Sequence, residues 1–367
     1  MPFAIHISQL GTIGLSRDLW LTHLSFRRRF TFMKYLLYAC LAYSASCFSQ
    51  DMPQLEHAIS AVNADKTLLT DIELIDDQLV AVGKHGVVIT STDAQSWQQA
   101  SVPTQVLLTA VDFYNNNLGW ACGHDATIIN TTDAGKTWQL QQALPDMDKP
   151  CLDILFTSEK HGYAVGAYGM FFETHDGGQK WQKRFLDSLL FEEDRAYLNE
   201  LKKSDPEGYE YETASILPHF NRIVKTNNRL ILVGEMGLMA ESFDNGGTWQ
   251  RLEEIYMGSF FTFASTADQS QGEDLVAGLR GNIFTRQTGS EQWQQIHTDN
   301  FATVNSAINY NNEWLLFANS GVIFHVKNDE LTEEQMDDGK SLLDGVVFQN
   351  KLIMASEDGI KVKELNP

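Results

Sequence analysis

A unit of two apolar strands joined by a glycine-containing turn recurs seven times along this chain, and this repeat most constrains the fold. Four copies read LVAVGKHGVVIT at 79–90, GWACGHDATIIN at 119–130, GYAVGAYGMFFE at 162–173 and LILVGEMGLMAE at 230–241. Three more read DLVAGLRGNIFT at 274–285, WLLFANSGVIFH at 314–325 and LIMASEDGIKVK at 352–363. Such periodicity indicates stacked copies of one supersecondary unit that bury a shared core.

A second unit follows the first in the earlier copies. It reads STDAQSW at 91–97, TTDAGKTW at 131–138, THDGGQKW at 174–181, SFDNGGTW at 242–249 and, in degenerate form, RQTGSEQW at 286–293. With the apolar run that precedes each first unit, every copy holds four short strands in roughly 40 residues, the size of a propeller blade. We therefore predict an all-β chain, a seven-bladed β-propeller of four-stranded blades; an open β-solenoid is the alternative.

The end of the chain bears on how the ring closes. Blade seven ends in ELNP after three strands, and the segment LEHAISAV at 55–62 is predicted to supply its missing outer strand. Closure of this kind removes the open sheet edges that invite aggregation. The isolated N-terminal segment and the shortened last blade favour a closed ring over a solenoid.

The repeated Asp, Gly and Trp are predicted to be structural, because a catalytic acid is rarely needed four times. A carboxylate at the hairpin bend can accept hydrogen bonds from its own turn, and Gly there adopts a left-handed conformation. The Trp offers a large apolar face at the start of the outer strand. Thr288 replaces the Asp in blade five. The residues are Asp93, Trp97, Asp133, Gly135, Trp138, Asp176, Gly178, Trp181, Asp244, Gly246 and Trp249.

The second unit resembles the Asp-box, or bacterial neuraminidase (BNR) repeat, which is structural and lies opposite the active site in sialidases. With the V-G-x-x-G turns, the chain resembles the photosystem II stability/assembly factor family, and GHDATIINTTDAGKTW and GEMGLMAESFDNGGTW match that family's blade pattern best. The match covers blades one to five, and blades six and seven only by the Gly turn. The resemblance implies a protein-binding scaffold that assists a membrane complex, with photosynthesis as the family's setting.

The Gly turns are predicted to surround one mouth of the central channel, on the face opposite the Asp turns. Loops that converge on such a concave surface commonly bind partners. The alternative is that these are merely exposed turn residues. The candidate binding residues are Lys84, His85, His124, Asp125, Tyr168, Glu235, Arg280, Glu357 and Asp358.

Two features of this ring bear on its ligand. The assembly-factor family associates its binding face with an arginine-rich patch, whereas this ring offers only Lys84 and Arg280 as cations. His85, His124 and Asp125 could meet around a metal, but three ligands from two turns have no fixed spacing. We therefore predict no metal site and no cofactor.

In the second unit, the spacing between the Trp of blade three (Trp181) and that of blade four (Trp249) is unusually long, which marks an insertion at 186–217. Its first part has the apolar spacing of a helix, and SDPEG then interrupts it. An inter-blade loop emerges on the Gly-turn face, so the insertion could cap the channel mouth, with Tyr197, Tyr209 and Tyr211 as partner contacts. Packing against its own propeller is the alternative.

Cys122 and Cys151 are the cysteines beyond the N-terminal region. By the strand pattern, one ends the second strand of blade two and the other begins the first strand of blade three. Two cysteines have no zinc-ligand spacing. A disulfide between these adjacent blades is feasible if the two Cα atoms come within roughly 7 Å of each other.

The N-terminal region differs from the repeats. RRRFTFMKYLLYACLAYSASC at 27–47 has the layout of a secretory signal, so residues 1–49 are predicted to be an upstream extension plus signal peptide, and 50–367 the propeller. A lipoprotein at Cys47 and an uncleaved anchor are alternatives. Export to the periplasm or an equivalent lumen is expected.

Charge restricts the partners. Beyond residue 49 the chain carries 22 Lys and Arg against 47 Asp and Glu, a net charge of −25. Such a surface repels nucleic acid and anionic lipid headgroups. A protein partner is expected, whereas neither nucleic acid nor strong membrane-surface binding is.

Enzymatic activity is not indicated. FNRI at 220–223 resembles the sialidase Phe-Arg-Ile-Pro motif only weakly, because it has an inserted Asn and lacks the Pro. No GxSxG, HExxH, P-loop or dinucleotide fingerprint occurs in the sequence. We predict a non-enzymatic scaffold with no catalytic residues. A glycan-binding or glycoside-hydrolysing propeller is the alternative, to be tested at Arg222 and Arg280.

Overall fold

Each sequence repeat forms one antiparallel sheet. The computed structural model describes residues 56–226, 228–266 and 272–365, and in these ranges the strands make seven sheets. The second strand of every blade is almost wholly buried, which explains its continuous apolar run. The predicted leader, residues 1–49, lies outside the described residues.

The strands of blades one to four are β1 (Leu69–Ile75), β2 (Gln78–Gly83), β3 (Val88–Ser91), β4 (Gln98–Gln99), β5 (Leu108–Phe113), β6 (Gly119–Gly123), β7 (Thr127–Thr131), β8 (Gln139–Gln142), β9 (Cys151–Phe156), β10 (Gly162–Gly166), β11 (Met170–Thr174), β12 (Gln182–Lys183), β13 (Phe220–Thr226), β14 (Arg229–Gly234), β15 (Met239–Ser242) and β16 (Gln250–Arg251). Those of blades five to seven are β17 (Phe260–Ser265), β18 (Glu273–Gly278), β19 (Ile283–Gln287), β20 (Gln294–Ile296), β21 (Val304–Tyr310), β22 (Glu313–Ala318), β23 (Val322–Lys327), β24 (Glu330–Gln335), β25 (Leu342–Phe348), β26 (Lys351–Ser356) and β27 (Gly359–Glu364). The helices are α2 (Glu192–Ser204) and α3 (Pro206–Thr213), with short 3-10 turns η1 (Ala64–Lys66), η2 (Lys84–Gly86), η3 (His124–Ala126), η4 (Pro145–Met147), η5 (Ala167–Gly169), η6 (Asp187–Leu189), η7 (Leu279–Gly281) and η8 (Asn319–Gly321).

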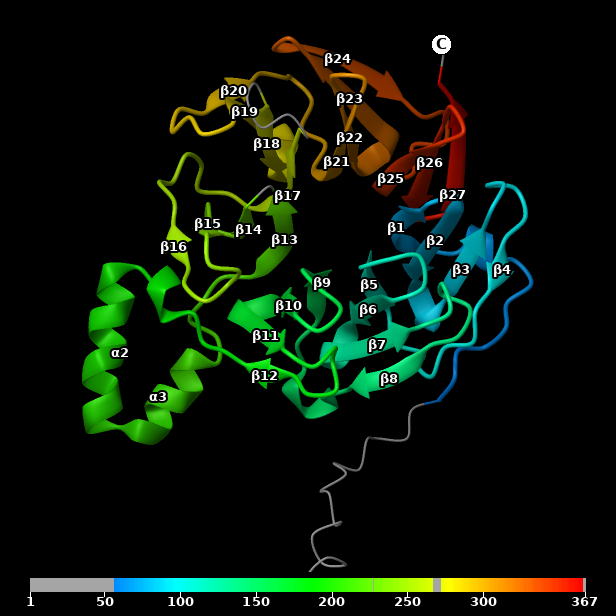
Figure 1. Cartoon of the computed structure of the whole chain (residues 1–367). Helices are drawn as coiled ribbons and strands as arrows, with labels where there is room; N and C mark the ends of the chain where they lie inside the picture. The colour runs from blue at the N-terminus through cyan, green and yellow to red at the C-terminus, as the bar shows by residue number, and fades with distance from the viewer. Residues whose placement is uncertain (1–55, 227, 267–271, 366–367) are drawn as a thin grey trace, which may run out of the picture. The chain divides into compact units, whose positions relative to one another are not determined.

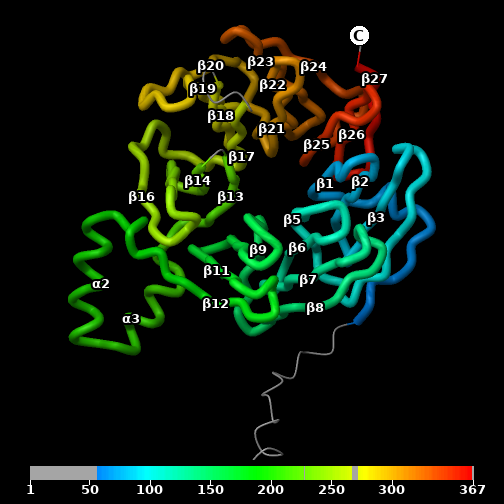
Figure 2. Tube along the Cα trace, in the orientation of Figure 1, coloured from blue at the N-terminus to red at the C-terminus, as the bar shows by residue number. Residues whose placement is uncertain are grey.

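The blades follow one another around a closed ring (Figures 1 and 2). The first strand of each blade lies innermost, and these strands contact one another in cyclic order, with β25 of blade seven against β1 of blade one. The predicted seven-bladed propeller is therefore confirmed, and the open solenoid is excluded by this β25–β1 contact.

The prediction that residues 55–62 complete blade seven is wrong. Blade seven has three strands in the described part of the chain, in the order β25-β26-β27. Residues 56–62 run beside blade one instead: the Ala58 N–H donates to the Val102 carbonyl at 2.9 Å, and the Ala61 N–H to the Gln99 side chain at 2.8 Å. Ala58 also packs on the apolar cluster shared by blades one and two, which holds the segment there.

Side chains near the start of the inner strands join the blades. The second residue of four inner strands donates to the carbonyl of the first residue of the next blade's inner strand, at 2.7–2.8 Å; the donors are Thr70, Thr109, Asn221 and Asn305. Carboxylates one position on accept the next blade's backbone N–H, as in Val111 N to Asp71 Oδ2 at 2.8 Å. Asp344 closes the ring by accepting from Ile72 N at 3.3 Å.

The Asp-box turns have the contacts that the sequence predicts. Asp133 accepts the Thr137 N–H at 2.9 Å and the Thr137 hydroxyl at 2.6 Å, and Gly135 has a φ of 79°. The Trp138 ring is buried and its indole N–H donates to the Gly135 carbonyl. Bonds from the Thr248 backbone lower the pKa of Asp244 to about 2, and bonds from the Ser96 and Gln95 backbone do the same for Asp93.

The insertion at 186–217 does not lie over the channel. Helices α2 and α3 sit beside blades three and four, outside the ring of blades (Figure 1). Leu186, Leu189, Leu198 and Leu217 are buried in the same apolar cluster as Trp249 of blade four. The suggestion that it caps the mouth is therefore wrong, because burial of this leucine face fixes it against the outer side of the propeller.

Cys122 and Cys151 form a disulfide between blades two and three, with Cα atoms 5.8 Å apart. The hairpin end of β6 and the start of β9 meet on the Gly-turn face, which brings the two side chains together. The bridge therefore ties two neighbouring blades near the mouth of the channel.

Removing the Asp-box carboxylate should destabilise the fold, and the effect should be measurable on the protein in the absence of any ligand. We expect Asp133→Ala to lower the free energy of unfolding by about 1–2 kcal/mol, because the Thr137 donors lose their acceptor. Urea denaturation would measure it, with the exposed Glu159→Ala as a matched control of small effect. Equal stability of the Asp133 variant and wild type would contradict the structural role.

Reduction of the disulfide should also lower stability. The cysteines are 29 residues apart, and a loop of that size corresponds to about 3.6 kcal/mol in the chain-entropy model. Urea unfolding with and without dithiothreitol would measure the loss, and the Cys122→Ala/Cys151→Ala double variant should not respond to the reductant. An unchanged midpoint for reduced wild type would contradict this expectation.

Candidate binding site

The V-G-x-x-G turns are shaped by close backbone contacts. A Cβ at Gly83 would lie 2.1 Å from the Leu68 carbonyl oxygen, and one at Gly86 would lie 2.0 Å from that of Thr104. The first glycine thus lets the turn approach the entry to its own inner strand, and the second lets it pass under the connection to the next blade. Gly86 also has a φ of 70°, which favours glycine.

The predicted ring residues lie on these turns. His85, Asp125, Tyr168 and Arg280 each occupy the left-handed position of their turn, with φ between 53° and 59°. Lys84, His85, His124, Tyr168, Arg280, Glu357 and Asp358 are exposed, whereas Asp125 and Glu235 are partly buried. Their role in binding stays a prediction.

The structure brings only some of them together. Tyr168 and Glu235 meet at His219: the Tyr168 and His219 rings are 4.6 Å apart, and Glu235 Oε1 lies 3.5 Å from His219 Nδ1. Glu357 pairs with Lys340 at 3.2 Å. His85 and His124 stand on turns of different blades. Within the described ranges, the group that meets metal-binding distances does not include them.

The tyrosines of the insertion separate into two kinds. Tyr197 and Tyr211 are 48% and 78% exposed. Tyr209 packs on the core cluster, and the Lys202 ammonium lies 5.2 Å from its ring centroid. The first two are therefore available to a partner, and Tyr209 holds the insertion to the propeller.

The central channel holds an acidic cluster around one arginine. A cavity of about 260 Å³ is lined by Arg222 and Lys225 together with five carboxylates, those of Asp71, Glu73, Asp112, Asp153 and Asp344. Arg222 Nε lies 3.7 Å from Asp153 Oδ2, and 30% of the Arg222 side chain remains exposed. Arg222, Asp71, Asp153 and Asp344 occupy the third position of their inner strands, at the Gly-turn end of the channel.

Burial sets the charge of this channel. It raises the pKa of Asp112 to about 7, with Asp153 adding repulsion, while the Phe156 N–H bond at 2.7 Å and Arg222 oppose the shift. Burial and Asp344 raise the pKa of Asp71 well above its usual range, and burial and Asp112 do so for Glu73. Asp153 and its acidic neighbours raise the pKa of Arg222, which stays charged.

Sequence reasoning considered Arg222 only as a possible sialidase residue and missed the cluster. A signal was present, since Asp recurs at the third position of the inner-strand runs LTDIELI, CLDILF and LLDGVVF. Arg280 lies on a Gly turn, and Arg229 and Arg286 both pair with the buried Asp274, at 2.6 and 3.0 Å. Among the described residues, Arg222 is the arginine that lines the channel cavity.

Comparison with known proteins shows which family these repeats resemble. The model of the photosynthesis system II assembly factor Ycf48 matches residues 88–150 and 141–232, from the third strand of blade one to the second strand of blade four. The chain is related to the photosystem II assembly factor family. The resemblance that the V-G-x-x-G and Asp-box motifs predicted is confirmed.

Curated relatives of this family match part of the chain. A photosystem II assembly lipoprotein Ycf48 from Synechococcus sp. is 28% identical over 148 residues, which is 40% of this chain and 37% of that protein. One from Parasynechococcus marenigrum is 28% identical over 174 residues, 41% of this chain and 50% of the relative. The chain thus spans about half the length of these relatives or less.

Solved structures agree on the fold. A structure described as Ycf48 bound to D1 peptide has a TM-score of 0.60 and 17% identity, and the match covers 86% of this chain and 98% of that one. Ycf48 from Cyanidioschyzon merolae also has a TM-score of 0.60, at 13% identity, covering 84% and 98%. At these identities the likeness establishes the propeller alone.

Two observations concern the membrane. The Synechococcus and Parasynechococcus relatives are named lipoproteins. Among the described residues, no helix is both long and apolar enough to span a bilayer. The lipidation considered for Cys47 lies outside the described residues.

Neutralising Asp112 should stabilise the protein in a pH-dependent way. Folding raises its pKa from 3.8 to about 7, so between these values the folded state binds more protons and this group costs stability as pH rises. We expect Asp112→Asn, which keeps the acceptor for Phe156 N, to gain stability over wild type by on the order of 2 kcal/mol more at pH 8 than at pH 5.

Urea unfolding at both pH values would measure this difference. The exposed Asp77→Asn serves as the control and should show no pH-dependent gain. A gain of the same size at pH 5 and pH 8 for Asp112→Asn would show that the carboxyl does not titrate as its burial requires.

Proposed function

We propose that this chain is a non-enzymatic, exported propeller that binds a protein segment on its Gly-turn face and so assists a membrane complex. The proposal rests on the residues that surround the Gly-turn mouth of the central channel. The partly exposed Arg222 and its carboxylates line a cavity at the Gly-turn end of the channel, and Tyr168 is exposed on a Gly turn of the same face. A concave polar floor with an exposed aromatic rim suits an extended peptide.

The relatives supply the class of partner. They are named photosystem II assembly proteins, and one matched propeller is described as bound to a D1 peptide. On this basis the partner of the present chain is a photosystem II subunit or a subunit of another membrane complex. The lipoprotein names of the relatives support export, with the periplasm or an equivalent lumen as the compartment.

Binding should depend on the Gly-turn face and not on the Asp-box face. Tyr168 is 48% exposed on a Gly turn, and Tyr114 is 43% exposed on a hairpin of the opposite face. We expect Tyr168→Asn to weaken binding of a D1 peptide about tenfold, because exposed tyrosines are frequent anchors in interfaces. Asn tolerates the left-handed backbone of that position. Isothermal titration calorimetry would measure it.

Tyr114→Asn is the matched control and should bind as wild type does. Tyr211→Ser tests the insertion separately, because removal of 186–217 would expose the leucines that it buries. Equal weakening in the Tyr114 and Tyr168 variants would contradict a site on the Gly-turn face. Weakening by Tyr211→Ser alone would move the site to the insertion.

A further inference from the structure

Two histidines and a glutamate converge on the Asp-box side of blade three. His161 precedes β10, Glu173 lies near the end of β11, and His175 follows it in the Asp-box turn. The register pairs Gly162 with Thr174 and Tyr163 with Glu173. His161 is therefore opposite His175, and Glu173, two residues before His175, lies on the same face of the sheet.

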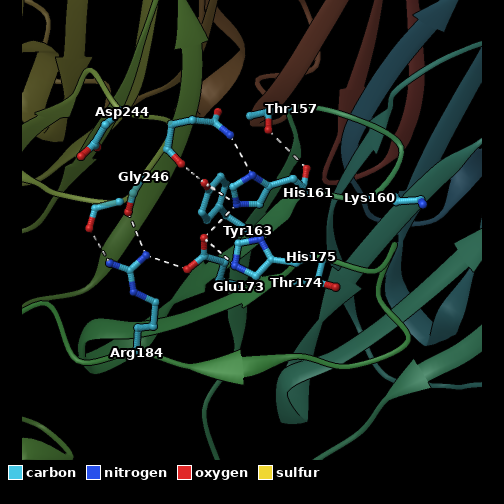
Figure 3. Close-up of polar contacts among 12 residues, drawn as sticks. Thr157, Lys160, His161, Tyr163, Glu173, Thr174, His175, Arg184, Asp244 and Gly246 are labelled. Carbon is cyan, nitrogen blue, oxygen red and sulfur yellow. Dashed lines mark hydrogen bonds and ion pairs between the residues drawn. The ribbon is translucent and has the colours of Figure 1, made fainter.

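The three side chains present their ligand atoms to one point (Figure 3). Glu173 Oε1 lies 2.8 Å from His161 Nε2 and 3.3 Å from His175 Nε2, and all three atoms lie within 4.8 Å of one another. Ligand atoms around a tetrahedral Zn²⁺ are separated by about 3.3–3.4 Å, given metal–ligand distances near 2.0–2.1 Å. Small side-chain rotations would bring the set to that spacing.

Neighbouring residues hold these ligands in place. The Arg184 guanidinium donates to the other Glu173 oxygen, Oε2, at 2.6 Å. It also donates to the Gly246 and Gly247 carbonyls of blade four, which fix its position. The Asn245 side-chain amide meets His161 Nδ1 at 2.7 Å. For His161 Nε2 to bind an ion, Nδ1 must carry the proton, so the Asn245 amide would have to turn and present Oδ1 as the acceptor that orients the ring.

The exposure of the group suits an ion taken from solvent. The side chain of Glu173 is only 9% exposed and that of His161 20%, whereas that of His175 is 62% exposed. The Glu173 carboxylate and the His161 imidazole thus form the floor of the group, and the exposed His175 imidazole lies on its solvent side. The Tyr163 hydroxyl, 2.8 Å from His161 Nε2, stands at the same edge.

We propose that His161, Glu173 and His175 form a site for a divalent transition metal ion, with Zn²⁺ as the best fit. Two imidazoles and one carboxylate are a known zinc ligand set, and three protein ligands leave a fourth position for water. Because Asn245 and Arg184 link this group to the Asp-box turn of blade four, the ion would strengthen the contact between the outer parts of blades three and four.

The alternative is a hydrogen-bonded network without an ion, in which His161 donates to Glu173 and Arg184 balances the carboxylate charge. The two readings differ at His175. Its imidazole is mostly exposed and lies 3.3 Å from Glu173, so it adds little to a network but is one third of a metal site. His175 is therefore the residue to change, since its loss leaves the fold intact.

Metal binding to the full chain, free of any polyhistidine tag, tests the proposal. We expect Zn²⁺ to raise the melting temperature of wild type, because an ion that binds only the folded state stabilises it by mass action. We expect Co²⁺ to develop the visible absorption of a tetrahedral site. His175→Ala should weaken Zn²⁺ affinity by about 100-fold or more, since even changes beyond the ligands cost 10–100-fold.

His297→Ala is the matched control: it removes another exposed histidine, after β20, and should leave the Zn²⁺ response unchanged. Glu173→Gln provides a second variant, which should lose the Co²⁺ spectrum while keeping the shape of the side chain. No Zn²⁺ response in wild type, or an equal response in wild type and His175→Ala, would overturn the proposal. The site lies on the face opposite the Gly turns, so peptide binding and metal binding can fail independently.

Discussion

The structure depends on how the inner strands of neighbouring blades hold one another. In the described part of the chain, the inner strands of neighbouring blades share no sheet, so side chains supply polar contacts between these strands. Here Thr70 and its counterparts donate to the next blade's carbonyl, and carboxylates such as Asp71 accept the next blade's N–H. The same device, from Asp344 to Ile72, joins the last blade to the first. Blade seven therefore needs no fourth strand from the N-terminus to complete the ring.

This way of joining blades also determines the chemistry of the channel. Each inner-strand carboxylate that accepts the next blade's N–H lies beside the channel axis. Several acids therefore meet there in a small volume. Their burial raises the pKa values of Asp71, Glu73 and Asp112, and Arg222 supplies the central positive charge. Architecture and candidate binding surface therefore use the same residues, and the polar floor of the mouth is a by-product of closure.

Repetition explains why much of the fold could be predicted. The Gly83 and Gly86 positions recur because a Cβ there would meet backbone oxygen, and Asp133 recurs because each hairpin needs an internal acceptor. Non-repeated segments lacked such a signal. Residues 56–62 were placed in blade seven by counting strands, whereas their contacts are with blade one. The insertion was placed over the mouth from its point of origin, whereas its leucines pack on the side of blades three and four.

The sequence by itself determined the number of blades and the two faces of each blade, because both are properties of a local repeat. Only the tertiary structure decided what meets across blades. Arg222 lines one cavity with acids of blades one, two, three and seven, and His161 and His175 meet Glu173 beside a turn of blade four. Arg222 and Asp71 share the third position of their inner strands, but the repeat specifies each blade alone. Only the closed ring brings strands that are far apart in the chain together.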